Sequence, residues 1–127
     1  MVLVLDSGGV SRLAERSRAA VALIVALRER ELWPPIVPSV VLVECLQGHQ
    51  GRDAHTNAFL EACDIVEDLP ESIARRAALL RRKAGKGSAV DALVIALAEP
   101  DGVVLTGDVG NLVALAEHAT RVRVERV

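Results

Sequence analysis

Aromatic residues are almost absent from this sequence: Trp33 and Phe59 are the only two among its 127 residues, and there is no tyrosine. Recognition of nucleic acid mainly by stacking bases on aromatic side chains is therefore excluded. Apolar residues still make up 51% of the chain, so we expect a core of Ala, Val, Leu and Ile. The length is that of one domain, and we expect residues 1–127 to form a single one.

Cysteines and long apolar runs are also scarce. Cys45 and Cys63 are the only cysteines, and they belong to no spaced metal-binding cluster. We expect both to be small buried hydrophobic residues in a reducing compartment. The longest apolar run, residues 19–27, falls well short of the roughly 20 residues that a membrane span needs. With no visible signal peptide, the chain is predicted to be cytoplasmic and to have no membrane association.

Short apolar runs alternate with longer helix-like stretches. The runs predict strands at residues 2–5, 36–37, 65–66 and 103–106, with an alternating edge strand at 122–127. The other stretches predict helices at residues 11–30, 40–46, 51–62, 71–83, 88–99 and 111–118. This alternation is typical of an α/β fold, a mostly parallel sheet of four or five strands with helices on both faces.

Four acidic residues lie where the chain enters or leaves these apolar elements: Asp6, Glu44, Asp91 and Asp108. Asp6 and Asp108 follow predicted strands directly, and the sites of such folds lie beyond the carboxyl ends of the strands. Glu44 and Asp91 lie in early turns of helices, which can face the same edge. Carboxylates beside apolar runs are costly unless they are paired, hydrogen-bonded or bound to metal. The four together predict one shared site for a divalent cation.

Each acid also has an ordinary structural interpretation. Asp6 can cap a helix or form a turn, as can Asp108, because Asp favours both places. Ser88 and Asp91 have the spacing of a capping box, in which the acid bonds back to the helix start. Glu44 can simply extend from its helix into solvent. The site hypothesis depends on the four occurring at the same kind of place in the topology.

Carboxylates without a cluster of His or Cys favour Mg²⁺ or Mn²⁺ over Zn²⁺. Such an ion offsets the repulsion among the acids, supplies a water nucleophile and stabilises charge on a transferring phosphate. The histidines His49, His55 and His118 have no paired spacing, and we expect them on the surface.

Four short motifs in order resemble the PIN-domain family, and the single-domain length resembles VapC-like toxins of type II toxin–antitoxin systems. The motifs are Leu-Asp-Ser at 5–7, Pro-Ser-Val-Val-Leu-Val-Glu at 38–44, Val-Asp-Ala-Leu-Val-Ile-Ala at 90–96 and Leu-Thr-Gly-Asp at 105–108. The resemblance covers nearly the whole chain. It implies a three-layer α/β/α sandwich and a Mg²⁺- or Mn²⁺-dependent endoribonuclease that hydrolyses RNA phosphodiesters.

The resemblance also implies partners and site roles. Asp6, Glu44, Asp91 and Asp108 carry over as catalytic metal ligands, and Thr106 as the supporting hydroxyl before the last acid. A cognate antitoxin and a toxin homodimer are implied, with a heterotetramer or larger assembly on antitoxin binding. Many family members have a further acid three residues after the last one, whereas this chain has Asn111. Asn111 can ligate metal through its neutral carbonyl oxygen only, so we expect weaker binding of a second ion.

A basic segment leads into Asp91. Its residues Arg81, Arg82, Lys83 and Lys86 are predicted to bind RNA phosphates. We expect most of this recognition to come from arginine guanidinium groups that donate paired hydrogen bonds to phosphate oxygens. The alternative is an ordinary solvated helix face.

Two other functions stay open. A phosphotransfer domain with Asp6 as nucleophile would want either a second acid where Gly8 stands or a late lysine, and neither is present. A catalytically weak or inactive PIN-like domain that binds RNA or a protein partner is the stronger alternative, and Asn111 is its main support.

Overall fold

A computed structural model describes residues 1–127. Its centre is one sheet of five strands in the order β3-β2-β1-β4-β5, and every neighbouring pair is parallel. The strands are β1 (Leu3–Leu5), β2 (Ile36–Pro38), β3 (Asp64–Val66), β4 (Val103–Thr106) and β5 (Arg123–Arg126). The predicted α/β class and parallel sheet are confirmed, and β5 is an edge strand as expected.

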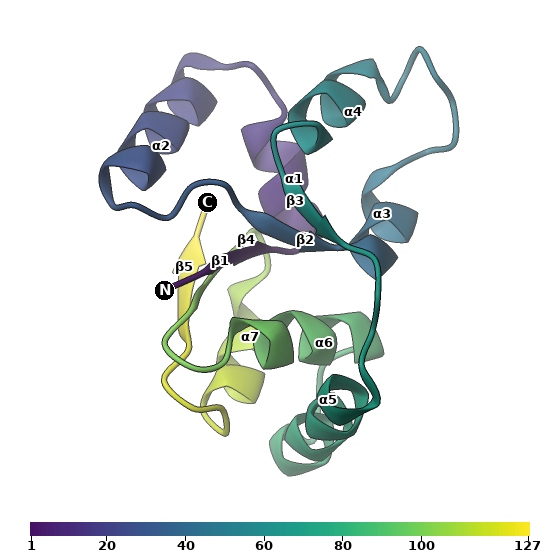
Figure 1. The fold of residues 1–127 in the computed structure, drawn as a ribbon, viewed down its shortest axis with the longest axis vertical. Coiled ribbons are helices and arrows are strands. Elements are labelled where there is room, and N and C mark those ends of the chain that lie inside the picture. Colours follow the sequence, from purple (N-terminus) through teal and green to yellow (C-terminus); the bar gives the residue numbers. More distant parts are fainter.

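Seven helices cover the sheet. They are α1 (Ser7–Leu13), α2 (Arg18–Glu29), α3 (Ser39–Cys45), α4 (Ala54–Leu60), α5 (Glu71–Ala84), α6 (Ala89–Ala98) and α7 (Val109–Ala116). Figure 1 shows α1, α2 and α4 on one side of the sheet and α5, α6 and α7 on the other, which gives the three layers of an α/β/α sandwich. None of these helices combines the length and apolar character that crossing a bilayer requires.

The two central strands form the middle of the core. β1 and β4 lie side by side, with Leu3, Val4 and Leu5 opposite Val103, Val104 and Leu105, and all six are at most 1% exposed. Helices cover both faces of these strands, so neither face can carry a polar side chain, and their sequence is a continuous apolar run. This packing fixes the positions of the residues that follow each strand.

The single helix predicted at residues 11–30 is wrong. The chain forms α1 from Ser7, breaks after Leu13, and begins α2 after Ser17, whose hydroxyl accepts a hydrogen bond from the amide of Ala20. In the sequence, the glycines after Asp6 look like a break between the first strand and the helix. Instead, Gly9 lets α1 lie directly on β4, because a Cβ there would overlap the carbonyl oxygen of Leu105.

The helix predicted at residues 51–62 is shorter in the structure, and its start depends on a residue that the sequence did not single out. The carboxylate of buried Asp53 accepts hydrogen bonds from the amides of Gln47, Gly48 and His49 at 2.9–3.1 Å. These bonds draw the chain into a closed loop, so α4 starts only at Ala54. They also hold the pKa of Asp53 below its ordinary value.

An ion pair joins α5 to the end of α6. Arg76 donates to both carboxylate oxygens of Glu99 at 2.8 and 2.7 Å, and the amide of Thr120 donates to the same group at 2.7 Å. The hydrogen bonds from Arg76 lower the pKa of Glu99. The Glu99 side chain is only 12% exposed, so little water competes for it.

Glu99→Gln should lower the free energy of unfolding at neutral pH by about 1.5 to 3 kcal/mol, the range for hydrogen bonds to charged groups. A carboxylate with a lowered folded-state pKa stabilises the fold above its ordinary pKa, and this stabilisation is lost as the pH falls through the folded-state value. The difference in free energy of unfolding between the wild type and Glu99→Gln should therefore become smaller in acid. Urea denaturation at pH 7 and at about pH 3 would measure it. Glu71→Gln is the control, because Glu71 pairs with Arg75 at 2.7 Å in full solvent and should contribute at most about 0.5 kcal/mol. Equal losses in the two variants would contradict this account.

Candidate functional site

Asp6 and Asp108 meet at the carboxyl ends of β1 and β4. Asp6 is only 7% exposed; one of its carboxylate oxygens accepts from the amide of Gly9 at 2.8 Å, and the other accepts from the hydroxyl of Thr106. Thr106 is fully buried, and its hydroxyl oxygen accepts from the amide of Asp108 at 2.9 Å. Thr106 therefore links the carboxylate of Asp6 to the backbone of Asp108.

Two glycines make this approach close. A Cβ on Gly8 would lie 2.9 Å from the amide nitrogen of Gly107, so the turn after β1 touches the turn after β4 through bare backbone. Neither glycine was predicted from the sequence to matter for this approach. The signal that could have identified them is that each lies within two residues of an acid at a strand end.

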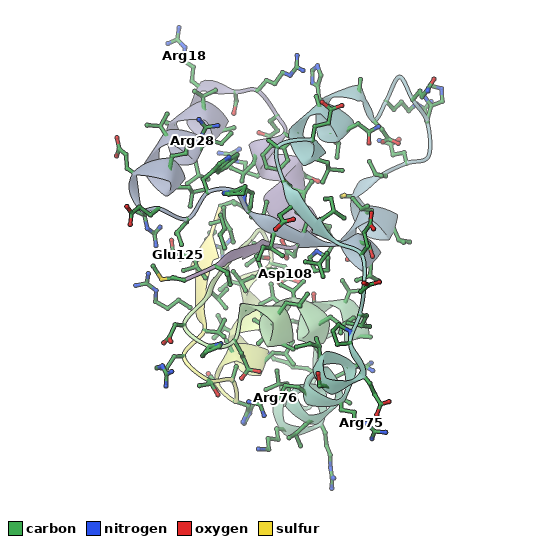
Figure 2. The ribbon with its side chains drawn as sticks, viewed as in Figure 1. Arg18, Arg28, Arg75, Arg76, Asp108 and Glu125 are labelled. Atoms are coloured by element: carbon green, nitrogen blue, oxygen red, sulfur yellow. The ribbon has the colours of Figure 1, made fainter.

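The carboxylate of Asp108 is free. Asp108 is the N-cap of α7, yet its side chain makes no capping hydrogen bond, and it is exposed. Figure 2 shows Asp108 near the middle of the molecule, between Arg18 at one end and Arg75 at the other. An oxygen ligand at the strand edge is thus left available.

Asp91 reaches the same edge from α6. This helix packs on β1 and β4, and a tight turn at Gly102 joins its end to the start of β4, so its first turn lies at the carboxyl end of the sheet. One turn after Asp91, Val94 and Ile95 are fully buried, which places Asp91 on the face that packs on the sheet. The predicted capping box is present: the Ser88 hydroxyl accepts from the Asp91 amide at 3.0 Å, and the Asp91 carboxylate accepts from the Ser88 amide at 3.1 Å.

Electrostatics couple these three acids. The pKa of Asp6 is raised above its ordinary value, first because the carboxyl group is buried and further because Asp91 and Asp108 are negatively charged. The hydrogen bonds from Thr106 and Gly9 oppose the rise without cancelling it. No ion pair in the structure includes any of the three. The result is a group of negative charges with no protein cation to balance it.

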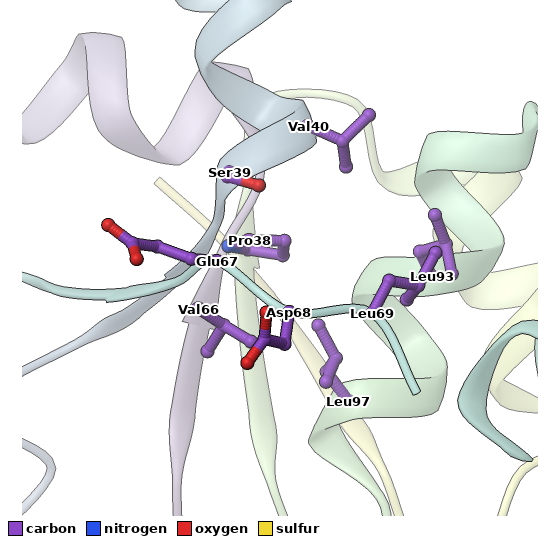
Figure 3. Close-up of a pocket in the computed structure, with 9 residues that line it drawn as sticks. All are labelled: Pro38, Ser39, Val40, Val66, Glu67, Asp68, Leu69, Leu93 and Leu97. Carbon is purple, nitrogen blue, oxygen red and sulfur yellow. The ribbon is translucent and has the colours of Figure 1, made fainter. Parts of the chain in front are cut away.

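Glu44 is exposed on α3, and no contact in the structure joins it to the other three acids. It follows Val40 by one turn of α3, so the two share a face of that helix. Figure 3 shows Val40 directed across a small hollow toward Leu93 and Leu97 of α6. Glu44 therefore extends from α3 on the side nearest α6.

The donor set fits a hard divalent cation by its chemistry: the oxygens are carboxylate, and their charge is uncompensated. The side chains as placed do not bring three acids close enough to hold such an ion. One reason is that a carboxylate oxygen of Asp6 and one of Asp91 already accept hydrogen bonds from backbone amides at the starts of α1 and α6. The other reason is that like charges repel. Asn111 is the third residue of α7, half-buried, and no contact ties it to the acids.

The basic residues lie at the end of α5 and in the turn before α6. The side chain of Arg81 donates to the carbonyl oxygen of Gly87 at 3.0 Å, so part of its guanidinium group is already hydrogen-bonded within the protein. Arg82, Lys83 and Lys86 are exposed and form no ion pair. Since α6 begins at the carboxyl edge, these charges approach the acids from the side of α5.

The remaining sequence-based expectations concern His and Cys. All three histidines are exposed, as predicted. Cys45 and Cys63 are free and half-buried rather than fully buried, and desolvation raises the pKa of the Cys63 thiol to about 12. Neither cysteine is poised to act as a thiolate nucleophile near neutral pH.

Comparison with known proteins shows a shared fold. No protein-family model and no curated protein matches the chain. Among solved structures, one chain of VapBC2 from Rickettsia felis, bound to a DNA fragment from its promoter, superposes with a TM-score of 0.73 and 13% identity, covering 100% of this chain and 99% of that one. A chain of FitAcB from Neisseria gonorrhoeae superposes with a TM-score of 0.60 and 18% identity, covering 97% and 96%. Both are toxin–antitoxin complexes, and at these identities the likeness extends to the fold alone.

Proposed function

We propose that this protein is a Mg²⁺- or Mn²⁺-dependent endoribonuclease of the PIN type, acting as the toxin of a type II toxin–antitoxin pair. The observation that carries the proposal is the coupled group of Asp6, Asp91 and Asp108, without any basic partner, at the carboxyl edge of a parallel sheet. The resemblance in sequence motifs and the fold shared with two toxin–antitoxin complexes support it. An edge lined by acids repels phosphates unless a cation intervenes, which favours a nuclease over a component that binds promoter DNA directly.

In this proposal Asp6, Asp91 and Asp108 would hold the ion, with Glu44 and Asn111 at the rim. When bound, the ion supplies an activated water and stabilises charge on the phosphate that is cleaved. Thr106 holds Asp6 and Asp108 together, and α6 presents Asp91. Arg82, Lys83 and Lys86, with the free part of Arg81, would bind phosphates beside the scissile one.

The direct test is cleavage of end-labelled RNA by the purified protein. We expect internal cuts with Mg²⁺ or Mn²⁺, none with EDTA, and recovery when the ion is restored. Cleavage that persists in EDTA would contradict a metal site. If neither ion supports cleavage of a broad set of cellular RNAs, the inactive binding domain becomes the better description.

The basic turn gives a separate prediction. Lys86→Glu should weaken binding of uncleaved RNA several-fold, measured with EDTA present, and lower the slope of log affinity against log salt by about 1. Arg18→Glu makes the same charge change on α2, at the far end of the molecule in Figure 2, and should leave the slope as it is. If both variants give the wild-type slope, the basic turn is only a solvated surface.

A groove on the side of the sheet that α1, α2 and α4 cover is the surface we propose for the antitoxin. It lies between α2 and α4, encloses about 260 Å³, and is lined by Leu13, Ala20, Val21, Ile24, Ala58 and Phe59 among others. Val21 and Val25 of α2 remain 55% and 50% exposed. An amphipathic helix of the partner would cover this surface, and a basic side chain on the same partner could reach the acids. We propose the homodimer, and larger assemblies with antitoxin, on the family resemblance alone.

Val21→Asp should abolish neutralisation by the cognate antitoxin, because a charge in this groove would be buried without a partner. Growth arrest by the variant alone should persist, while co-expression no longer restores growth and the two proteins no longer co-purify. Leu79→Asp places a charge on α5, where Leu79 is 41% exposed and away from the groove, and should be neutralised normally. Full neutralisation of Val21→Asp would place the antitoxin elsewhere.

A further inference from the structure

Three residues from neighbouring strands form a row across the carboxyl edge of the sheet. On β4 and β5, Thr106 is directly opposite Arg126. On the other side of β4, Leu105 is opposite Leu5 of β1. The next residues along the chain, Thr106 and Asp6, are therefore neighbours too, and the bond from the Thr106 hydroxyl to the Asp6 carboxylate joins them. Arg126 thus lies one strand spacing, about 4.8 Å, from the residue that holds Asp6.

The side chain of Arg126 belongs to the face of the sheet that α7 covers. Successive side chains of a strand alternate between the two faces. Glu125 bonds Arg30 at the end of α2, so its side chain is on the face that α2 covers. Val124 lines a hollow together with Val113 of α7. Arg126 is two residues after Val124, so it shares that face, at the end of β5 where α7 begins.

Arg126 is a free cation at this edge. It is exposed and takes part in no ion pair. The two other arginines of the segment are engaged, since Arg121 pairs with Asp101 and Arg123 lies 3.8 Å from Glu125. The donors of the Arg126 guanidinium group are therefore available to a ligand, on the β5 side of the acids.

The chain around Asp108 leaves this side open. Gly107 and Gly110 flank Asp108, and all three residues are exposed. A Cβ on Gly107 would come no closer than 3.9 Å to its neighbours, and a Cβ on Gly110 would meet only an Asp108 carboxylate oxygen, also at 3.9 Å. Both positions have room for a side chain that glycine does not supply. Neither residue therefore screens Asp108 from a ligand that Arg126 binds.

We propose that Arg126 binds an RNA phosphate beside the acidic group, on the β5 side. This inference rests on the proposed ribonuclease function and adds a substrate contact to it. A guanidinium group donates paired hydrogen bonds to phosphate oxygens and stays charged at any pH that the fold survives. The acids repel the RNA backbone, and a cation next to them offsets that repulsion. The RNA strand is then held on both sides of the acids, by Arg126 and by the basic turn that contains Lys86.

The test measures binding of a short fluorescein-labelled single-stranded RNA over a range of salt concentrations, with EDTA present to prevent cleavage. Arg126→Gln should weaken binding about 3- to 10-fold and lower the slope of log affinity against log salt by about 0.7, the value for one phosphate contact on a single strand. Arg126→Lys keeps the charge and should keep the slope. Arg123→Gln is the matched control, because it removes the same charge from the other end and the other face of β5, and it should also keep the slope.

Two further measurements separate substrate binding from a structural role. In cleavage with Mn²⁺, Arg126→Gln should raise KM for the RNA by a similar factor and leave kcat near the wild-type value. Mn²⁺ affinity without RNA, measured by isothermal titration calorimetry, should not fall, because removing a cation beside the acids cannot weaken their attraction for another cation. A fall would show that Arg126 supports the acidic edge itself and would overturn the proposal.

A wild-type slope and KM in Arg126→Gln would also overturn it, as would equal losses in Arg123→Gln. In either case the proposed nuclease stands if the wild type still cleaves RNA with Mn²⁺, and only the role of Arg126 is lost. If the wild type neither binds nor cleaves RNA, the proposed function fails and this inference fails with it.

Discussion

Asp6→Asn should reduce RNA cleavage by a factor on the order of a thousand and abolish growth arrest, while the protein stays folded. Asparagine keeps the volume and can preserve both hydrogen bonds, accepting from Gly9 and donating to Thr106. It removes the charge at the most buried point of the acidic group. Without that charge, the remaining acids attract a divalent ion too weakly to place it beside a phosphate.

The same variant should be more stable than the wild type in the absence of metal. The pKa of Asp6 is raised by burial and by its acidic neighbours, so ionisation of Asp6 opposes folding once the pH rises above the ordinary carboxyl range. The gain in melting temperature should therefore be present at neutral pH and vanish in acid, where both proteins carry a neutral side chain.

Asp64→Asn provides the control for cleavage. Asp64 is exposed at the start of β3, the opposite end of the sheet, so the variant makes the same chemical change away from the site. It should cleave RNA at the wild-type rate. Cleavage by Asp6→Asn at that rate would contradict the site assignment.

Thr106→Val is expected to have the next largest effect, lowering divalent-ion affinity about 10- to 100-fold. Valine fills the same space but has no hydroxyl. It leaves the second oxygen of the buried Asp6 without its donor and the Asp108 amide without its acceptor. The free energy of unfolding should also fall, by about 1 to 3 kcal/mol, the cost of unpaired buried polar groups.

Thr106→Ser separates these two effects. Serine restores the hydroxyl and omits a buried methyl group, so it should recover most of the ion affinity while losing about 1 kcal/mol of stability. Thr56→Val on α4, where no hydrogen bond to the hydroxyl occurs, should leave ion affinity unchanged. If Thr106→Val binds ions like the wild type, Thr106 is merely a core residue.

The parts of the fold that the sequence predicts are those that local composition determines. A strand buried on both faces must be apolar throughout, so β1 and β4 could be located with nearly correct bounds. The residues that follow such strands lie at the carboxyl edge by topology, and this identified Asp6 and Asp108. The capping box at Ser88 and Asp91 is equally local. Of the two interpretations of Asp91, the capping one is seen in the structure.

The parts that sequence reasoning missed depend on contacts between distant segments. The bond from Thr106 to Asp6 spans 100 residues of chain, and only the pairing of β1 with β4 creates it. The early start of α1 depends on the room that Gly9 leaves for β4. Arg81 was predicted as a phosphate ligand from its charge alone, and its bond to Gly87 needs the geometry of the α5–α6 turn.

A crystal of the protein grown with Mn²⁺, with anomalous diffraction recorded at the manganese absorption edge, tests the central claim most directly. We predict one strong anomalous peak at the carboxyl ends of β1 and β4, about 2.0 to 2.3 Å from carboxylate oxygens of Asp6, Asp91 and Asp108. Bound manganese elsewhere on the protein, with none among these three acids, would contradict the account.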